Sequence, residues 1–188
     1  YQQAQSICLP GHGSLTPEYV VILGHPSQVD DAWCQTCDRP GTDRCRQNSH
    51  QTGSVLSNSV GYALKKVLVH ASIDPTTVFY TSTVRCTGKP PGIVQIRRCR
   101  AYLLDEMSML DLSQCRGIML LGDSAVHGVL NQAYLTVRNT RLRVLEGAAP
   151  PWGPPVRATY HPVELLLRHS GAITQEEMVA DFVDLQKP

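Results

Sequence analysis

The stretch RGIMLLGDSAVHGVL, residues 116–130, has the pattern of a buried strand that is followed at once by a helix. Its first six residues, Arg116 to Leu121, are mostly apolar and are expected to form a strand that Gly122 ends. Asp123 or Ser124 then provides the N-cap of a helix that we expect to end at Leu130. A strand that turns tightly into a helix is the building unit of α/β folds with a parallel sheet.

The same alternation of strand and helix continues in both directions along the chain. Further strands are expected at Tyr19 to Leu23, Thr77 to Thr83, Leu142 to Leu145 and Val156 to Tyr160. Further helices are expected at 59–69, at 96–110 and at 174–185, the last one opening with the capping box Thr174 and Glu177. This order predicts a three-layer α/β/α sandwich with a mostly parallel central sheet. Ligands of such sheets bind beyond the carboxyl ends of the strands, where we expect the functional residues.

The length and composition of the chain are those of one globular domain. It has 188 residues, of which 42% are hydrophobic, and its formal net charge of +1 excludes a polycationic nucleic-acid binder. No apolar run approaches the roughly 20 residues of a membrane span, and the first residues lack the pattern of an export signal. We therefore expect one domain over residues 1–188 with a Cys-rich insertion at about 29–51. We expect it in the cytoplasm or at the nucleoid, without a membrane partner.

Cysteine is used in an unusual way for a chain of this kind. The count of seven is odd, which argues against a disulfide scaffold and for reduced thiols that include metal ligands. Cys115 lies beside an apolar run and is expected in the core. The insertion contains the pattern Cys34-x2-Cys37-x7-Cys45-x4-His50, whose ligand types suit a tetrahedral zinc ion.

Two further cysteines lie in basic surroundings. Cys86 follows Arg85 in the loop after an expected strand, and Cys99 lies in the next helix between arginines. Iron–sulfur clusters are held by thiolates, and neighbouring cations favour the deprotonated thiol. The alternative is a pair of unrelated cysteines beside a solvated basic face.

A histidine ends the last expected strand, in the sequence Tyr160-His161-Pro162. At such a place His161 can donate a hydrogen bond to an anion that develops during a reaction. The alternative is an ordinary structural histidine.

The pieces that matter for a family resemblance are Leu23-Gly24-His25-Pro26-Ser27, 53–61, Thr81-Ser82-Thr83-Val84-Arg85-Cys86, Cys99, Leu121-Gly122-Asp123-Ser124-Ala125 and Tyr160-His161-Pro162. In this order they resemble the uracil-DNA glycosylase superfamily, most closely its iron–sulfur families four and five. Each piece is short, but their order and spacing cover nearly the whole chain except the insertion. The resemblance implies a glycosylase-like sandwich, DNA as the partner and a [4Fe–4S] cluster.

At three positions of the catalytic motifs the sequence differs from the family that it resembles. The acid that positions the attacking water falls on Gly24, the aromatic that stacks on the base falls near Leu56, and the Asn that recognises the pyrimidine edge falls on Ser82. The histidine that stabilises the departing base is kept as His161. The candidate substitutes for the lost groups are His25, Asp30, Asp31 and Asn58.

The implied cluster ligands depart from the family pattern as well. Cys86 and Cys99 match two ligands, but before the first strand the chain has Cys8 alone where the family has a pair. Either one thiol of the insertion completes the set, or Cys34 and Cys37 replace the lost pair. The separate zinc site of the insertion remains a third alternative.

Contacts with DNA are expected from cations and from one leucine-rich loop. Arginines and lysines near the active end engage phosphates, and the candidates are Arg39, Arg44, Arg46, Arg85, Lys89, Arg97, Arg98, Arg100 and Arg168. The leucines at 165–167 match the family's loop that wedges into the base stack, which makes Leu166 a DNA-contact candidate. The alternative is that these leucines turn to the core.

Two functions remain. The loss of the catalytic acid, the aromatic and the asparagine favours a non-catalytic, DNA-binding iron–sulfur protein that assists repair or replication. A repair or replication subunit is then a further partner. The alternative is an active, divergent glycosylase that flips and excises uracil or another damaged base. The enzyme requires a cavity lined by His25, Leu56, Ser82 and His161, whereas the accessory protein predicts a blocked or apolar one.

Overall fold

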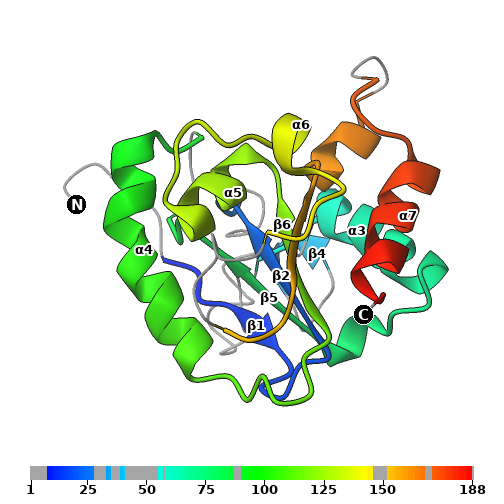
Figure 1. The fold of residues 1–188 in the computed structure, drawn as a ribbon, viewed down its shortest axis with the longest axis horizontal. Coiled ribbons are helices and arrows are strands. Elements are labelled where there is room, and N and C mark those ends of the chain that lie inside the picture. The colour runs from blue at the N-terminus through cyan, green and yellow to red at the C-terminus, as the bar shows by residue number, and fades with distance from the viewer. Residues whose placement is uncertain are drawn as a thin grey trace.

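The computed structural model describes residues 8–27, 33–34, 39–40, 55–56, 58–86, 90–145, 152–167 and 171–187 (Figure 1). Its centre is a five-stranded sheet in the order β1-β5-β2-β6-β7. These strands are β1 His12–Gly13, β2 Tyr19–Leu23, β5 Val78–Ser82, β6 Gly117–Leu121 and β7 Val156–Thr159. The last four run parallel to their neighbours, and β1 pairs antiparallel with β5 at one edge. The mostly parallel α/β sheet predicted from the sequence is therefore confirmed.

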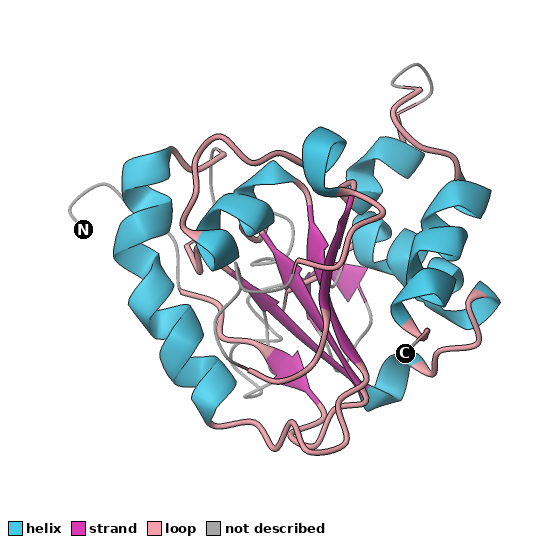
Figure 2. Ribbon diagram, viewed as in Figure 1, coloured by secondary structure: helices cyan, strands magenta, loops and turns pink. Residues whose placement is uncertain are grey.

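Helices cover both faces of this sheet and make it the middle layer of three (Figure 2). They are α3 Ser59–His70 and α7 Gln175–Leu185 on one face, and α4 Ile93–Ser108 and α5 Asp123–Leu130 on the other. A hydrophobic core lies on each face of the sheet, and alternate side chains of β2 point into one core or the other. Val21 and Leu23 pack with α3 and α7, whereas Val20 and Ile22 pack with α4 and α5. All five residues of β2 are buried, as a strand covered on both faces requires.

Two details of the sequence-based prediction are wrong. The segment Leu142 to Leu145 is not a strand but follows the short helix α6 Val137–Thr140, because Leu142 has a φ of 67°, which an extended strand does not allow. The cap of α5 is Gly122, with a φ of 84°, and Asp123 is already the first helical residue. The capping box of α7 is confirmed, since Thr174 and Glu177 each accept a hydrogen bond from the other's backbone N–H.

Several short elements carry too little periodicity to be expected from sequence. They are β1, β3 Trp33–Cys34, β4 Arg39–Pro40, the 3₁₀-helices η1 Pro75–Thr77 and η2 Pro162–Leu165, and α6. Strands β3 and β4 pair antiparallel within the Cys-rich insertion. Within the described segments, no helix combines the length and the apolar character needed to cross a membrane.

Candidate functional site

A cavity of about 360 Å³ opens at the carboxyl ends of β2 and β6. Four segments form its wall. They are the end of β2 and the residues after it (Leu23, Gly24, His25 and Ser27), the start of α3 and the turn before it (Leu56, Asn58 and Val60), the junction of β6 and α5 (121–124), and His161 with Val163 at η2. Its volume lies within the range of small-molecule sites. The cavity brings together His25, Leu56, Asn58 and His161, which are far apart in the sequence.

Two glycines let the segments of this wall approach one another. A Cβ on Gly24 would lie 2.4 Å from Cβ of Ser124, so β2 and the first turn of α5 meet because Gly24 has no side chain. Gly122, with its positive φ, sits where a Cβ would lie 3.2 Å from Cβ of His161. Close packing at these two glycines brings β2, α5 and the His161 segment together around the cavity.

Substituting Gly24 with alanine tests this packing. We expect the free energy of unfolding to fall by about 1–3 kcal/mol, because the added methyl group overlaps the Ser124 side chain. Urea titration measures the loss, and the second substitution S124G in the same chain should recover most of it. An unchanged stability of G24A would contradict the close packing of β2 against α5.

His161 is the best-defined polar group of the cavity. Its Nδ1 accepts a hydrogen bond from the backbone N–H of Val163 at 3.2 Å. Burial, with a smaller contribution from His25, lowers the pKa of His161 to about 4, so the ring is neutral at pH 7. Because an amide N–H can only donate, the neutral ring carries its proton on Nε2. His161 is therefore an uncharged hydrogen-bond donor on the ring edge opposite Val163.

His25 shares the wall with His161. Burial lowers its pKa below the usual histidine value as well. The cavity therefore contains two imidazoles that favour the neutral form, and protonating either places charge close to the other.

Asn58 lies in the wall, but its amide is engaged in the fold. Its Oδ1 accepts from the backbone N–H groups of Val60 and Gly61, which caps α3, and its Nδ2 donates to Oγ of Ser27 at 2.7 Å. Leu56, beside it, is buried with a φ of 62°. A Cβ on Gly61 would lie 1.6 Å from the Leu56 carbonyl oxygen, so this glycine is needed for the turn before α3. Asn58 thus shapes the cavity and holds Ser27.

Ser82 differs from its expected position, because it is not among the residues that form the cavity wall. It is 1% exposed at the end of β5, and its hydroxyl donates to the backbone carbonyl of Val84. Ser82 therefore does not replace the asparagine amide that recognises the edge of the base in the family.

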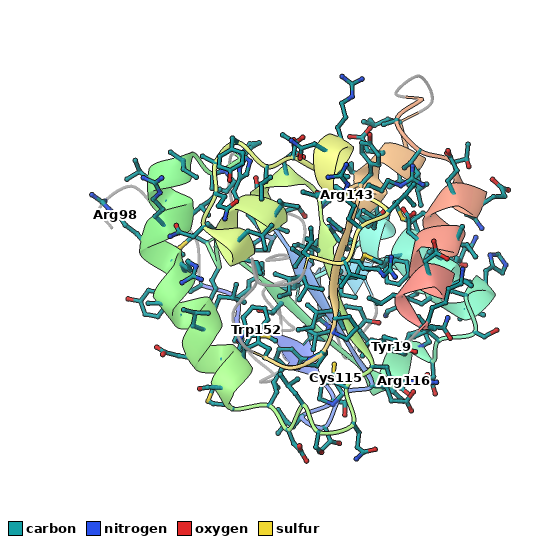
Figure 3. All side chains as sticks on the ribbon, in the orientation of Figure 1. Tyr19, Arg98, Cys115, Arg116, Arg143 and Trp152 are labelled. Carbon is teal, nitrogen blue, oxygen red and sulfur yellow. The ribbon has the colours of Figure 1, made fainter. Side chains whose placement is uncertain are left out.

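Arg85 is also used differently from the expected phosphate contact. Its guanidinium forms an ion pair of 2.9 Å with the buried carboxylate of Glu106 and donates to the carbonyl of Tyr102. Glu106 further accepts from the N–H of Gly11 and from the hydroxyl of Thr81. These contacts tie Arg85 to the interior between α4 and β5. Arg98, by contrast, projects from α4 into solvent (Figure 3).

The leucine-rich loop divides between core and solvent. Leu165 packs against the core, whereas Leu166 and Leu167 are 44% and 52% exposed. The side chains of Lys89 and Arg168 lie outside the described residues.

Three of the predicted cluster ligands, Cys8, Cys86 and Cys99, lie near one another. Cys8 and Cys86 face each other with their sulfur atoms 3.3 Å apart, across an isolated β-bridge. Burial, the hydrogen bond with Cys8 and the nearness of Cys8 and Cys99 raise the pKa of Cys86 to about 11. Within the part of the chain that is described, no group of three or more His, Cys, Asp or Glu side chains is arranged to hold a metal ion. Cys34 is described by its backbone alone, and Cys37, Cys45 and His50 lie outside the described residues.

Cys115 lies apart from this group, beside Tyr19 and Arg116 near the amino ends of β2 and β6 (Figure 3). It packs against the core and its thiol donates to the carbonyl of Gly117 at 3.5 Å, as expected for a structural cysteine.

Asp123 and Ser124 lie in the cavity wall, although the sequence pattern predicts only a helix-capping role for them. Oδ1 of Asp123 accepts from the backbone N–H of Val137 at 2.7 Å and so joins α5 to α6. The signal that could have identified Asp123 is its position directly after the glycine that ends β6, at the ligand-binding edge of the sheet.

Comparison with known proteins gives one clear relation. Residues 41–186 match the family model of the uracil DNA glycosylase superfamily. No curated protein matches the chain. The family match spans well over half of the sequence and includes every segment of the cavity wall from Leu56 onwards. The chain belongs to the uracil DNA glycosylase superfamily.

Proposed function

We propose that this protein is a DNA glycosylase that accepts a flipped base in the cavity beyond β2 and β6 and hydrolyses its N-glycosidic bond. Membership in the superfamily implies DNA as the substrate. The observation that carries the proposal is the state of His161, a neutral ring with its donor on Nε2 in the wall of a cavity of about 360 Å³. A preorganised neutral donor stabilises the negative charge that the departing base acquires.

The rest of the wall suits the same task. Leu23, Leu56 and Leu121 provide apolar surface against which a base can lie, although none of them stacks as an aromatic ring would. Excluding water from such a space strengthens the hydrogen bond from His161 to the departing base. Leu56 supports the proposal further, since a residue held at positive φ inside a cavity is typical of functional sites.

The exposed leucines after η2 are proposed to fill the space that a flipped base leaves in duplex DNA. Replacing Leu166 and Leu167 together with alanine should lower base release from duplex DNA about tenfold, and leave release from single strands nearly unchanged, because unstacking costs a few kcal/mol per step. Parallel single-turnover assays on the two substrates measure this ratio, with L142A as the control for an exposed leucine elsewhere. Equal losses on both substrates would argue against a wedge.

The test of the proposed function is a panel of oligonucleotides with uracil, hypoxanthine or hydroxymethyluracil at one position. Anaerobically purified protein is mixed in excess with each oligonucleotide, and the free base and the abasic strand are quantified together. The proposal expects equimolar release of the base from at least one substrate. Binding without release from any of them would contradict it.

A second candidate function rests on one observation. The amide of Asn58 is used by the fold and Ser82 lies off the wall, so neither recognises the edge of a base. This favours a DNA-binding accessory protein of repair or replication that has lost catalysis. Binding without base release in the panel is the result expected for that function.

The proposal includes a [4Fe–4S] cluster held by Cys8, Cys86 and Cys99 with one thiol of the insertion, Cys34 or Cys37. The three described thiols come from three separate segments: the sulfur atoms of Cys8 and Cys86 lie 3.3 Å apart, and Cys99 is near enough to contribute to the raised pKa of Cys86. Thiolates are the ligands that such clusters require, and a bound cluster would join the N-terminal segment, the loop after β5 and α4. A zinc ion at Cys34, Cys37, Cys45 and His50 is the alternative for the insertion.

Metal content separates these possibilities. We expect close to stoichiometric iron and sulfide in anaerobically purified protein, and their loss in C86S and in C99S. C115S is the matched control, since Cys115 lies near the amino ends of the strands, and it should keep its iron. Zinc without iron in the wild-type protein would contradict the cluster.

A further inference from the structure

A glycosylase needs a group that orients the attacking water, and the assignment of that group here rests on the proposed function. Hydrolysis of an N-glycosidic bond needs a donor for the departing base and an acceptor that orients the attacking water. His161 is the donor. The resemblance places the acceptor at Gly24, which has no side chain.

The structure shows what occupies the space at Gly24 instead. A Cβ there would lie 2.4 Å from Cβ of Ser124, so the first turn of α5 fills the place of a side chain on residue 24. An acid cannot be accommodated at Gly24 without moving that turn. The turn itself begins with an acid, Asp123.

Asp123 is the carboxylate of the cavity, because no other described residue of the wall has one. Its Oδ1 is fixed by the N–H of Val137 at 2.7 Å, while Oδ2 has no hydrogen-bond partner within the described segments. The side chain is exposed, so water reaches it. Gly122, the neighbour of Asp123, is in close contact with His161, which brings the acceptor and the donor into one cavity.

We infer that Asp123 orients the attacking water and accepts its proton. In the step, the water oxygen forms a bond to C1′ while the bond between C1′ and the base nitrogen breaks. The electron pair of that bond goes to the base, which accepts a hydrogen bond from Nε2 of His161. The proton lost by water goes to Oδ2 of Asp123. The carboxylate also stabilises the positive charge that develops on the sugar.

The test uses D123N, which removes the charge but keeps an oxygen that can accept from Val137. Single-turnover base release is measured on a substrate that the wild-type protein cleaves, and D105N, an exposed acid of α4, is the control. We expect D123N to lower the rate by about 10²- to 10⁴-fold, with oligonucleotide affinity and melting temperature unchanged.

A second readout is independent of turnover. Two uncleavable oligonucleotides carry either a cationic pyrrolidine or a neutral tetrahydrofuran ring in place of the damaged nucleoside. The wild-type protein should bind the cationic one more tightly, and D123N should lose that preference. If the wild-type protein releases base while D123N matches it in rate and in preference, the inference is wrong and the proposed function stands. If the wild-type protein releases no base, the proposed function fails and the inference falls with it.

Discussion

Replacing His161 with asparagine is expected to lower the single-turnover rate of base release by about 10²- to 10³-fold, the effect of losing one donor to a developing anion. Asparagine is a good N-cap residue, so its Oδ1 can still accept from the N–H of Val163 and hold the start of η2. What the substitution removes is the Nε2 donor. Rapid-quench measurement of the free base gives the rate.

The control for H161N is H70N, which alters an exposed histidine at the end of α3, outside the cavity wall. Its rate should stay within a factor of about two of the wild-type rate, since surface changes of this kind are nearly neutral. A rate for H161N that equals the rate of H70N would show that His161 does not contact the departing base.

Replacing Glu106 with alanine is expected to lower the free energy of unfolding by about 3–5 kcal/mol, because it leaves the partly buried guanidinium of Arg85 without its partner. The same change removes the acceptor for the N–H of Gly11 and for the hydroxyl of Thr81. Three polar groups outside α4 thus lose their partner on Glu106 at once. Urea titration of the purified protein measures the difference.

D105A is the matched control, since Asp105 precedes Glu106 on α4 and is exposed. Its stability should stay within about 0.5 kcal/mol of the wild-type value. Because Arg85 precedes Cys86, we also expect E106A to lower the content of the proposed iron–sulfur cluster. A loss of stability in E106A as small as that in D105A would contradict the internal role of the ion pair.

The layers of the fold could be predicted from the sequence because each carries a strong local signal. The run at 117–121 is apolar and ends at a glycine, and its five residues are all buried in β6. The capping box of Thr174 and Glu177 gives the start of α7 to the residue. By contrast, the two residues of β1 show no periodicity, and the pattern of residues 142–145 predicts a strand although Leu142 adopts a positive φ.

The candidate site could be predicted in part. The rule that ligands bind at the carboxyl ends of parallel strands leads to His25 and His161, the family resemblance adds Asn58, and the structure places all three in one wall. The sequence predicts that Arg85 binds phosphate, because nothing local in the sequence reveals Glu106 as its partner. The sequence predicts only a helix cap at Asp123, since its place in the cavity wall depends on how α5 packs against Gly24.

The most direct test of the account is a crystal structure of the protein with an uncleavable 2′-fluoro analogue of the nucleoside that it releases, placed within an oligonucleotide. We expect the base to lie in the cavity between Leu56 and His161, with Nε2 of His161 within hydrogen-bond distance of a base acceptor and Asp123 beside the sugar. A base that stays stacked in the DNA, or binds elsewhere on the protein, would contradict it.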